Sequence, residues 1–295
     1  MNILVTGACG QLGNELQLQA AQNPHHRWSF TDVAAQADSV FAVLPLDITD
    51  RTAVEAFVED NGIEVVVNCA AYTAVDRAES EPERALLLNA TAPGYLAAAI
   101  NRHGGQLIQI STDYVFDGTA YKPYTEDLPS CPTSVYGSTK LEGELSVRLA
   151  NPSAMIIRTA WLYSHFGNNF VKTMLRLGSE RPELGVVFDQ IGTPTYARDL
   201  AVAIMTAINQ GIQPGIYHFS DEGVCSWYDF ALAIHRLAGI TTCRVRPLHT
   251  AEYPTPAARP HYSVLDKTKI KTTYGLTIPY WLDSLEACIK ELMPE

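Results

Sequence analysis

The chain has 295 residues, of which 47% are hydrophobic and 18% are charged, and its formal net charge is −11. This composition excludes a disordered chain, and the acidic balance opposes non-specific binding to nucleic acid. The sequence contains no apolar run of about eighteen residues and no basic signal segment at its N-terminus, so we expect a cytoplasmic protein with no membrane partner. The length favours one large α/β domain with a smaller companion.

Apolar, β-branched segments alternate with helical stretches through the first half of the chain. Strands are predicted at 2–6, 27–32, 64–70, 105–112 and 153–160, and helices at about 10–22, 50–60, 79–103 and 134–150. Continuous hydrophobicity is typical of strands buried on both faces, which indicates a parallel sheet covered by helices. The alternation therefore predicts an α/β fold, a Rossmann-like doubly wound parallel sheet.

The second half of the chain is less regular. Helices are predicted at 169–180 and near 196–210, 226–239 and 280–292, strands at 183–189 and 215–220, and an ordered proline-rich loop at 249–263. We predict a dinucleotide-binding domain over 1–160, on which later elements at about 196–220 pack, and a smaller C-terminal substrate-binding domain over 161–295. The six cysteines are scattered singly and show no metal-ligand spacing, so they are expected to be reduced thiols.

The first predicted strand leads into a glycine-rich turn, "VTGACGQLG". Gly7, Gly10 and Gly13 are three residues apart and open a helix that begins with Gln11 and Leu12. Glycines let the backbone approach a pyrophosphate closely, and a helix N-terminus supplies N–H donors to it. A plain tight turn would explain the glycines alone, but their position between strand and helix predicts a site for NADPH or NADH.

Acidic residues near the ends of the next two strands are further candidates for cofactor binding. Asp32 ends the second strand about twenty residues on, where an acid would bind ribose hydroxyls and favour NAD over NADP. Arg51 or another side chain could still accept a 2′-phosphate. Asp47, followed by Ile48, could contact the adenine or could cap the next helix, for which Thr49 and Asp50 are equally suited.

Small residues end the strand predicted at 64–70, as is needed where a cofactor crosses the edge of the sheet. Ala70 and Ala71 are followed by Tyr72 and Thr73, and all four are expected to be neighbours of the cofactor.

A threonine and a Tyr-x-x-x-Lys motif follow in the order of an active site. Thr112 ends the strand predicted at 105–112, at the edge where open α/β sheets bind ligands. Its hydroxyl can donate to a carbonyl oxygen. Tyr136 and Lys140 are four residues apart, so both can reach one ligand from one helix face, and a nearby cation lowers the pKa of a phenol. Alone, this spacing would indicate an exposed helix face. Together with the glycine-rich turn, it predicts a catalytic site in which Tyr136 passes a proton.

These motifs resemble the extended short-chain dehydrogenase/reductase family. Within it, "TAVDRAESEPE", "STDYVFDG", "VYGSTKLEGE", "GNNFVKTMLRL", "DQIGTPT" and "YPTPAARPHYS" resemble the dTDP-4-dehydrorhamnose reductases, over the chain up to about residue 270. The resemblance implies reduction of the C4 ketone of dTDP-4-dehydro-6-deoxy-L-mannose by NADPH or NADH to dTDP-L-rhamnose. It also implies that Tyr136 is the general acid, that Lys140 lowers its pKa and holds the nicotinamide ribose, and that Thr112 orients the ketone.

The same resemblance implies a set of substrate contacts. Asp113 and Trp161 match sugar contacts, although Trp161 could equally be a core aromatic. Asn168 and Asn169 stand where relatives hold the nucleotide diphosphate. Further candidates are Lys172 and Arg176, which could instead form the solvated side of the following helix, and Arg259, as a second phosphate ligand or a partner in a surface salt bridge. Asn89 matches a family asparagine behind the active site, but it could also be purely structural.

Other functions remain open. Thr112-Asp113-Tyr114 lacks the glutamate of the Thr-Asp-Glu motif in related dehydratases, which argues against dehydration. A reductase or epimerase acting on another nucleotide-linked keto sugar would use the same residues. A non-catalytic nucleotide-binding regulatory subunit is a further alternative, against which the three intact catalytic residues argue. The family also implies a homodimer and Mg²⁺ near a subunit contact, for which Glu15 is the one candidate, but the sequence assigns no metal site.

Overall fold

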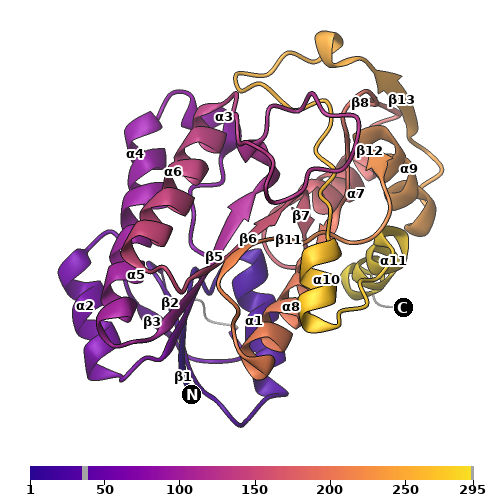
Figure 1. The fold of residues 1–295 in the computed structure, drawn as a ribbon. Helices are drawn as coiled ribbons and strands as arrows, with labels where there is room; N and C mark the ends of the chain where they lie inside the picture. The colour runs from indigo at the N-terminus through magenta and orange to yellow at the C-terminus, as the bar shows by residue number, and fades with distance from the viewer. Residues whose placement is uncertain (35–38, 294–295) are drawn as a thin grey trace.

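A seven-stranded parallel sheet forms the centre of the computed structural model, which describes residues 1–34 and 39–293 (Figure 1). The strand order is β11-β6-β5-β4-β1-β2-β3, and every neighbouring pair is parallel. The strands are β1 (Asn2–Thr6), β2 (Arg27–Asp32), β3 (Val43–Pro45), β4 (Val65–Asn68), β5 (Gln106–Thr112), β6 (Met155–Thr159) and β11 (Gly215–His218). The order reverses between β1 and β4, so the predicted Rossmann-like doubly wound fold is confirmed, with a ligand crevice expected at this reversal.

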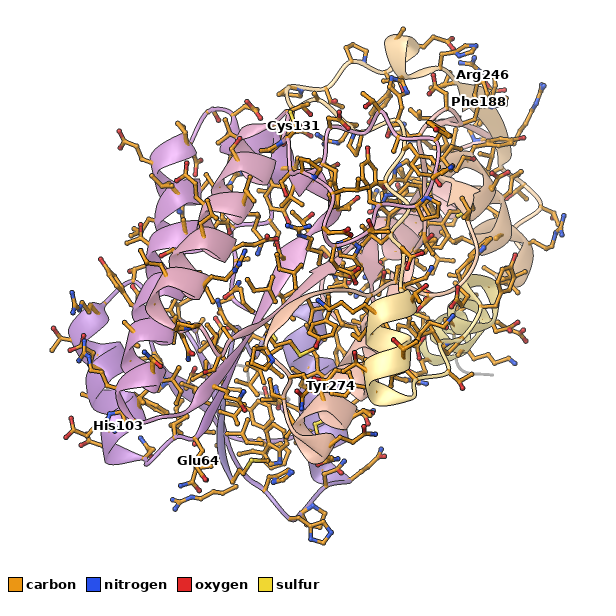
Figure 2. The ribbon with its side chains drawn as sticks, in the orientation of Figure 1. Glu64, His103, Cys131, Phe188, Arg246 and Tyr274 are labelled. Atoms are coloured by element: carbon orange, nitrogen blue, oxygen red, sulfur yellow. The ribbon has the colours of Figure 1, made fainter. Side chains whose placement is uncertain are left out.

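Helices cover both faces of this sheet (Figure 1). One face carries α1 (Gln11–Ala21), α8 (Ala197–Gln210) and α10 (Thr268–Tyr274), and the other carries α2 (Arg51–Asp60), α5 (Ala92–Arg102) and α6 (Val135–Ala150). Successive residues of a strand point to opposite faces, so Ile3 and Val5 enter the first core and Leu4 enters the second. Tyr274 of α10, labelled in Figure 2, is buried in the first core.

The segment predicted as one helix over 79–103 is divided in the structure. After α3 (Val75–Ala78), it consists of α4 (Pro82–Leu86), a π-helical turn η1 (Leu87–Thr91) and α5. Asn89 lies in this turn, where its Oδ1 accepts from the Tyr72 N–H at 2.8 Å and its Nδ2 donates to Thr139 Oγ1 at 3.1 Å. Through the side chain of Asn89, the π-helical turn thus connects the loop after β4 to α6. Single π-helical turns are frequent near functional sites.

The C-terminal part of the chain forms a separate hydrophobic core. The helices α7 (Phe170–Glu180), α9 (Trp227–Leu237) and α11 (Trp281–Leu292) pack there with the parallel pair β8 (Glu183–Val187) and β13 (Arg244–Leu248). Shorter elements are β7 (Leu162–Tyr163), β9 (Ile191–Gly192), β10 (Thr195–Tyr196), β12 (Cys225–Ser226), and the 3₁₀ turns η2 (Asp113–Val115) and η3 (Thr250–Glu252). The sequence did not predict β13 or α10.

The two-domain division stays a prediction, and its last two residues, 294–295, lie outside the described part of the chain. Within 196–220, α8 packs in the core of the large sheet, and β11 extends that sheet beyond β6. Among the described residues, no helix combines the length and apolarity that crossing a membrane requires.

Candidate active site

A cavity of about 750 Å³ opens at the carboxyl edge of the sheet, where the order of β1 and β4 reverses. This volume lies within the range of roughly 300–1,000 Å³ that is usual for ligand pockets. The predicted site residues that line it are Gly7, Gly10, Gln11, Leu12, Gly13, Asp32, Ile48, Ala70, Ala71, Thr73, Thr112, Asp113, Tyr136, Lys140, Trp161, Asn168 and Asn169. Six other predicted residues, Asp47, Tyr72, Asn89, Lys172, Arg176 and Arg259, do not belong to its described lining.

The glycine-rich turn has the geometry that a dinucleotide pyrophosphate needs. Gly7 has φ +68°, and a Cβ there would lie 2.5 Å from the backbone nitrogen of Ala70. A Cβ on Gly13 would overlap the carbonyl oxygen of Gly7, so strand and helix can approach only with glycine at both places. Gly10 is the N-cap of α1 and offers no side-chain cap, which leaves the first-turn amides for phosphate oxygens. The turn therefore fits a nicotinamide dinucleotide.

Asp32 is fixed at the rim of the cavity by two backbone donors. Its Oδ1 accepts from the Val33 N–H at 2.7 Å, and its Oδ2 accepts from the Cys9 N–H at 3.0 Å. Lys140 is the only lysine or arginine among the described residues that line the cavity. A carboxylate thus stands where the ribose of an adenosine would lie, without a cation beside it in the lining.

Two predicted cofactor contacts have other partners in the structure. The exposed Asp47 carboxylate accepts from the N–H and hydroxyl of Thr49 at 2.9 and 2.7 Å. Asp50, rather than Asp47 or Thr49, caps α2 by accepting from the Ala53 N–H at 3.0 Å. Tyr72 is buried and donates its hydroxyl to Glu81 at 3.0 Å. Both side chains are therefore engaged in local structure outside the cavity wall.

Tyr136 and Lys140 lie on the first two turns of α6, which begins at the N-cap Ser134. Tyr136 and Thr112, which ends β5, both line the cavity. Lys140 Nζ donates to the carbonyl oxygen of Ile110 at 2.6 Å. The helix can approach the strand this closely because its Gly137 leaves room for the backbone of Tyr114. The predicted trio is thus gathered at one cavity wall.

Burial controls the protonation of both α6 side chains. It raises the pKa of Tyr136 to about 12 and lowers the pKa of Lys140 to about 8. The predicted lowering of the Tyr136 pKa by Lys140 is therefore wrong in this structure, because desolvation dominates and the ammonium donates to Ile110. At neutral pH the phenol keeps its proton, which is the form that a general acid requires.

Asp113 presents a carboxylate oxygen in the cavity wall. Thr112 Oγ1 donates to its Oδ1 at 2.9 Å, and among the described residues its buried Oδ2 has no hydrogen-bond partner. Burial raises the pKa of this carboxyl to about 6. An unpartnered buried oxygen costs free energy unless a ligand satisfies it, so Asp113 is suited to accept from a sugar hydroxyl.

Trp161 lines the cavity rather than filling a core away from it. Its backbone has φ +48°, an outlier for a bulky residue, and such strain persists only where packing fixes it. Its indole stacks on Trp227 with ring centroids 3.6 Å apart. Trp227 also lines the cavity, but no motif surrounds it in the sequence, and we did not predict it.

The remaining predicted substrate residues are divided between the cavity and its supports. Asn169 lines the cavity but also caps α7, and its Nδ2 donates to Gln11 Oε1 at 2.9 Å. Lys172 Nζ donates to the carbonyl oxygen of His165 at 3.2 Å. Arg259 pairs with Asp76 at 2.8 Å, which is the salt-bridge alternative, and this pair connects the proline-rich loop to α3.

Arg176 and Glu15, the other two candidates, also have local partners. Arg176 pairs with Glu180 at 2.8 Å on the exposed side of α7. Glu15 is fully buried, accepts from Ser164 Oγ at 2.6 Å, and has a pKa raised by that burial. No three histidine, cysteine, aspartate or glutamate side chains gather as metal ligands within residues 1–34 and 39–293. Mg²⁺ stays unassigned.

Comparison with known proteins gives one consistent family. The model of the RmlD substrate binding domain family matches residues 1–293. The dTDP-4-dehydrorhamnose reductase of Burkholderia thailandensis is 39% identical over 315 residues, with 100% of each chain covered.

Two crystal structures of full-length relatives are also similar to this chain. One is a dTDP-4-dehydrorhamnose reductase of Clostridium acetobutylicum, with a TM-score of 0.92, 47% identity and 99% of each chain covered. The other is the Bacillus anthracis dTDP-4-dehydrorhamnose reductase in complex with NADP, with a TM-score of 0.90 and 39% identity, covering 98% of this chain and 99% of that one. The chain therefore belongs to the family of the RmlD substrate binding domain, together with the dTDP-4-dehydrorhamnose reductases.

Proposed function

We propose that this protein is an NAD(P)H-dependent dTDP-4-dehydrorhamnose reductase, which reduces the C4 ketone of dTDP-4-dehydro-6-deoxy-L-mannose to give dTDP-L-rhamnose. The observation that carries the proposal is the placement of Thr112, Tyr136 and Lys140 in one cavity with the glycine-rich turn. Full-length relatives with this activity in their names support the same choice of substrate. The NADP complex of one relative supports a nicotinamide dinucleotide as the cofactor.

Each catalytic side chain has a role that its surroundings favour. The cofactor, when bound, would supply the hydride to C4. Tyr136 is protonated at neutral pH and donates its proton to the developing alkoxide, while Thr112 orients the ketone oxygen. The Lys140 ammonium holds the nicotinamide ribose. Burial strengthens these interactions because little water competes for the charges.

We assign the sugar and nucleotide contacts to Asp113 and to the side of the cavity formed after residue 160. Asp113 accepts from a sugar hydroxyl through its unpartnered Oδ2, and Trp161 packs against the sugar ring. Asn168 provides an amide for the diphosphate beside the N-terminus of α7, where the helix dipole favours negative charge, and Asn169 caps that helix. A two-domain, cytoplasmic homodimer remains the prediction from the sequence.

The test follows the loss of reduced nicotinamide absorbance when the purified protein meets enzymatically prepared dTDP-4-dehydro-6-deoxy-L-mannose, with NADPH and NADH in parallel. Turnover with dTDP-L-rhamnose as the product, identified by NMR, is the expected result. A folded protein that binds both cofactors but turns over with neither would contradict the proposal. Turnover of a different dTDP-linked or UDP-linked keto sugar in preference would assign the same chemistry to another substrate.

A further inference from the structure

A buried ion pair lies directly behind the catalytic lysine. Glu144 follows Lys140 by one turn of α6 and is 2% exposed. Arg158 of β6, also 2% exposed, donates to it through two nitrogens, Nε to Oε1 at 2.8 Å and Nη2 to Oε2 at 2.7 Å. Ser111 of β5 donates its hydroxyl to the same Oε1 at 2.5 Å. One carboxylate thus joins α6, β5 and β6 with a bidentate, charge-assisted geometry.

The contacts between β5 and α6 form a series in which Glu144 is the last. The carbonyl oxygen of Ile110 accepts from Lys140, the hydroxyl of Ser111 donates to Glu144, and Thr112 lines the cavity together with Tyr136. Tyr136, Lys140 and Glu144 are spaced four residues apart, so they share one face of the helix. Glu144 therefore fixes the position of Ser111, the strand residue between Ile110, which binds Lys140, and Thr112.

The charges around Lys140 give Glu144 a second effect. Burial disfavours the ammonium, and the negative charge of Glu144 opposes this by raising the lysine pKa. Cys69, the other acidic group that acts on Lys140, is a thiol whose own pKa is raised by burial, so it is neutral at the pH of turnover. Arg158 binds both oxygens of Glu144. Although Glu144 is paired with Arg158, its charge is consequently the one that favours the Lys140 ammonium in this low-dielectric region.

We propose that Glu144 is a positioning residue, whose carboxylate keeps Lys140 protonated and seated against β5 beneath Thr112 and Tyr136. The part of this inference that concerns turnover rests on the proposed function. The part that concerns cofactor binding does not, because a protonated Lys140 would also stabilise a bound nicotinamide ribose. Two measurements therefore separate the two proposals.

The experiment compares the wild type, E144Q and S111A in kcat/KM and in the Kd of NADH, measured by its fluorescence, over about pH 6–10. In the wild type, kcat/KM should fall and the Kd of NADH should rise as the pH rises through the pKa of Lys140. In E144Q, this alkaline limb should move to lower pH by about one unit, which is about a tenfold loss at a pH above the limb. S111A removes a hydrogen bond but no charge, so any loss of its activity should be the same at every pH.

Because E144Q leaves the buried Arg158 without its partner, E144Q/R158M is measured beside it, since replacing both members of a buried pair is often tolerated. The limb should also move to lower pH in this double variant. The proposal would be overturned if the alkaline limb of a folded variant coincided with that of the wild type. It would also be overturned if E144Q lost the same fraction of activity at every pH. A wild-type Kd of NADH that does not rise at alkaline pH would overturn the proposal as well, and this measurement needs no variant. A shifted Kd profile in a protein without turnover would reject the proposed substrate and keep this inference.

Discussion

The indole of Trp161 stacks on the indole of Trp227 with 3.6 Å between ring centroids and 12° between ring planes. The two rings come from segments far apart in the sequence, the residue before β7 and the first residue of α9. The backbone of Trp161 has a positive φ. Trp227 packs against the face of its indole and so contributes to holding Trp161 in the cavity wall. The C-terminal core thereby determines the shape of the cavity on the side that we assign to the sugar.

The first prediction concerns this stack. Trp227→Leu should raise KM for the nucleotide sugar by about 2–10-fold, because an aromatic pair contributes about 0.5–1.5 kcal/mol beyond its buried area. The Kd of NADH should not change. Steady-state kinetics and cofactor titration measure both. Trp28→Leu is the control, since Trp28 stacks on Phe30 away from the cavity, and an equal rise in KM there would contradict the prediction.

The second prediction concerns the general acid. Tyr136→Phe should lower kcat by about 10²–10⁴-fold, the usual contribution of a positioned acid, while NADH still binds. Tyr163→Phe is the matched control, because among the described residues the buried Tyr163 hydroxyl has no hydrogen-bond partner. That control should keep kcat near the wild-type value. Near-normal turnover by Tyr136→Phe would refute the assigned role of Tyr136.

The third prediction concerns the choice between cofactors. Asp32→Asn keeps an oxygen acceptor for one of the two backbone donors, the N–H groups of Cys9 and Val33, and removes the charge that would repel a 2′-phosphate. The ratio of kcat/KM for NADPH to that for NADH should rise by about tenfold, equivalent to about 1.4 kcal/mol. Asp47→Ala should leave the ratio and both KM values unchanged, because Asp47 bonds with Thr49 outside the cavity. A change in Asp47→Ala alone would restore Asp47 as a cofactor contact.

The fourth prediction concerns stability in acid. Burial lowers the pKa of His218 from 6.5 to about 3, and its Nδ1 lies 3.0 Å from the carbonyl oxygen of Tyr124. Between these pKa values the unfolded chain binds a proton that the folded chain does not, so stability falls as the pH decreases through this window. From about pH 7 to 5 the contribution of His218 is about 2 kcal/mol.

Urea unfolding at several pH values tests this. His218→Asn should lose less stability than the wild type over the same window, whatever its stability at neutral pH. His25→Asn, at an exposed position, should have the wild-type dependence. Parallel curves for the wild type and His218→Asn would show that His218 does not titrate as described.

The large sheet was predictable because its strands carry their own signal. Residues buried on both faces must be apolar, so continuous runs such as "NILVT" are recognised without knowledge of their neighbours. In β13, by contrast, Arg244 and Arg246 alternate with apolar residues, and the strand forms only because it pairs with β8. The division of the helix predicted at 79–103 also depends on a distant contact, the one between Asn89 and Thr139 of α6. Local patterns contain no information about such partners.

The site shows the same limit. The glycine-rich turn, Thr112, Tyr136 and Lys140 were predictable because strand ends and helix starts of this fold converge on one edge of the sheet. Trp227, Glu144 and Arg158 were missed because their roles depend on contacts between segments far apart in sequence. The pKa of Tyr136 was predicted in the wrong direction because spacing reveals a neighbouring charge but not the degree of burial.

The outer position of β11 has a consequence for how the protein is made. A ribosome completes β6 long before it reaches β11 and α8, so the growing chain has an unpaired strand edge and an uncovered apolar face on α1. Exposed edges and apolar faces of this kind promote aggregation. Truncation after residue 160 would leave β6 and α1 without the partners that β11 and α8 provide, because these partners are synthesised only after β10.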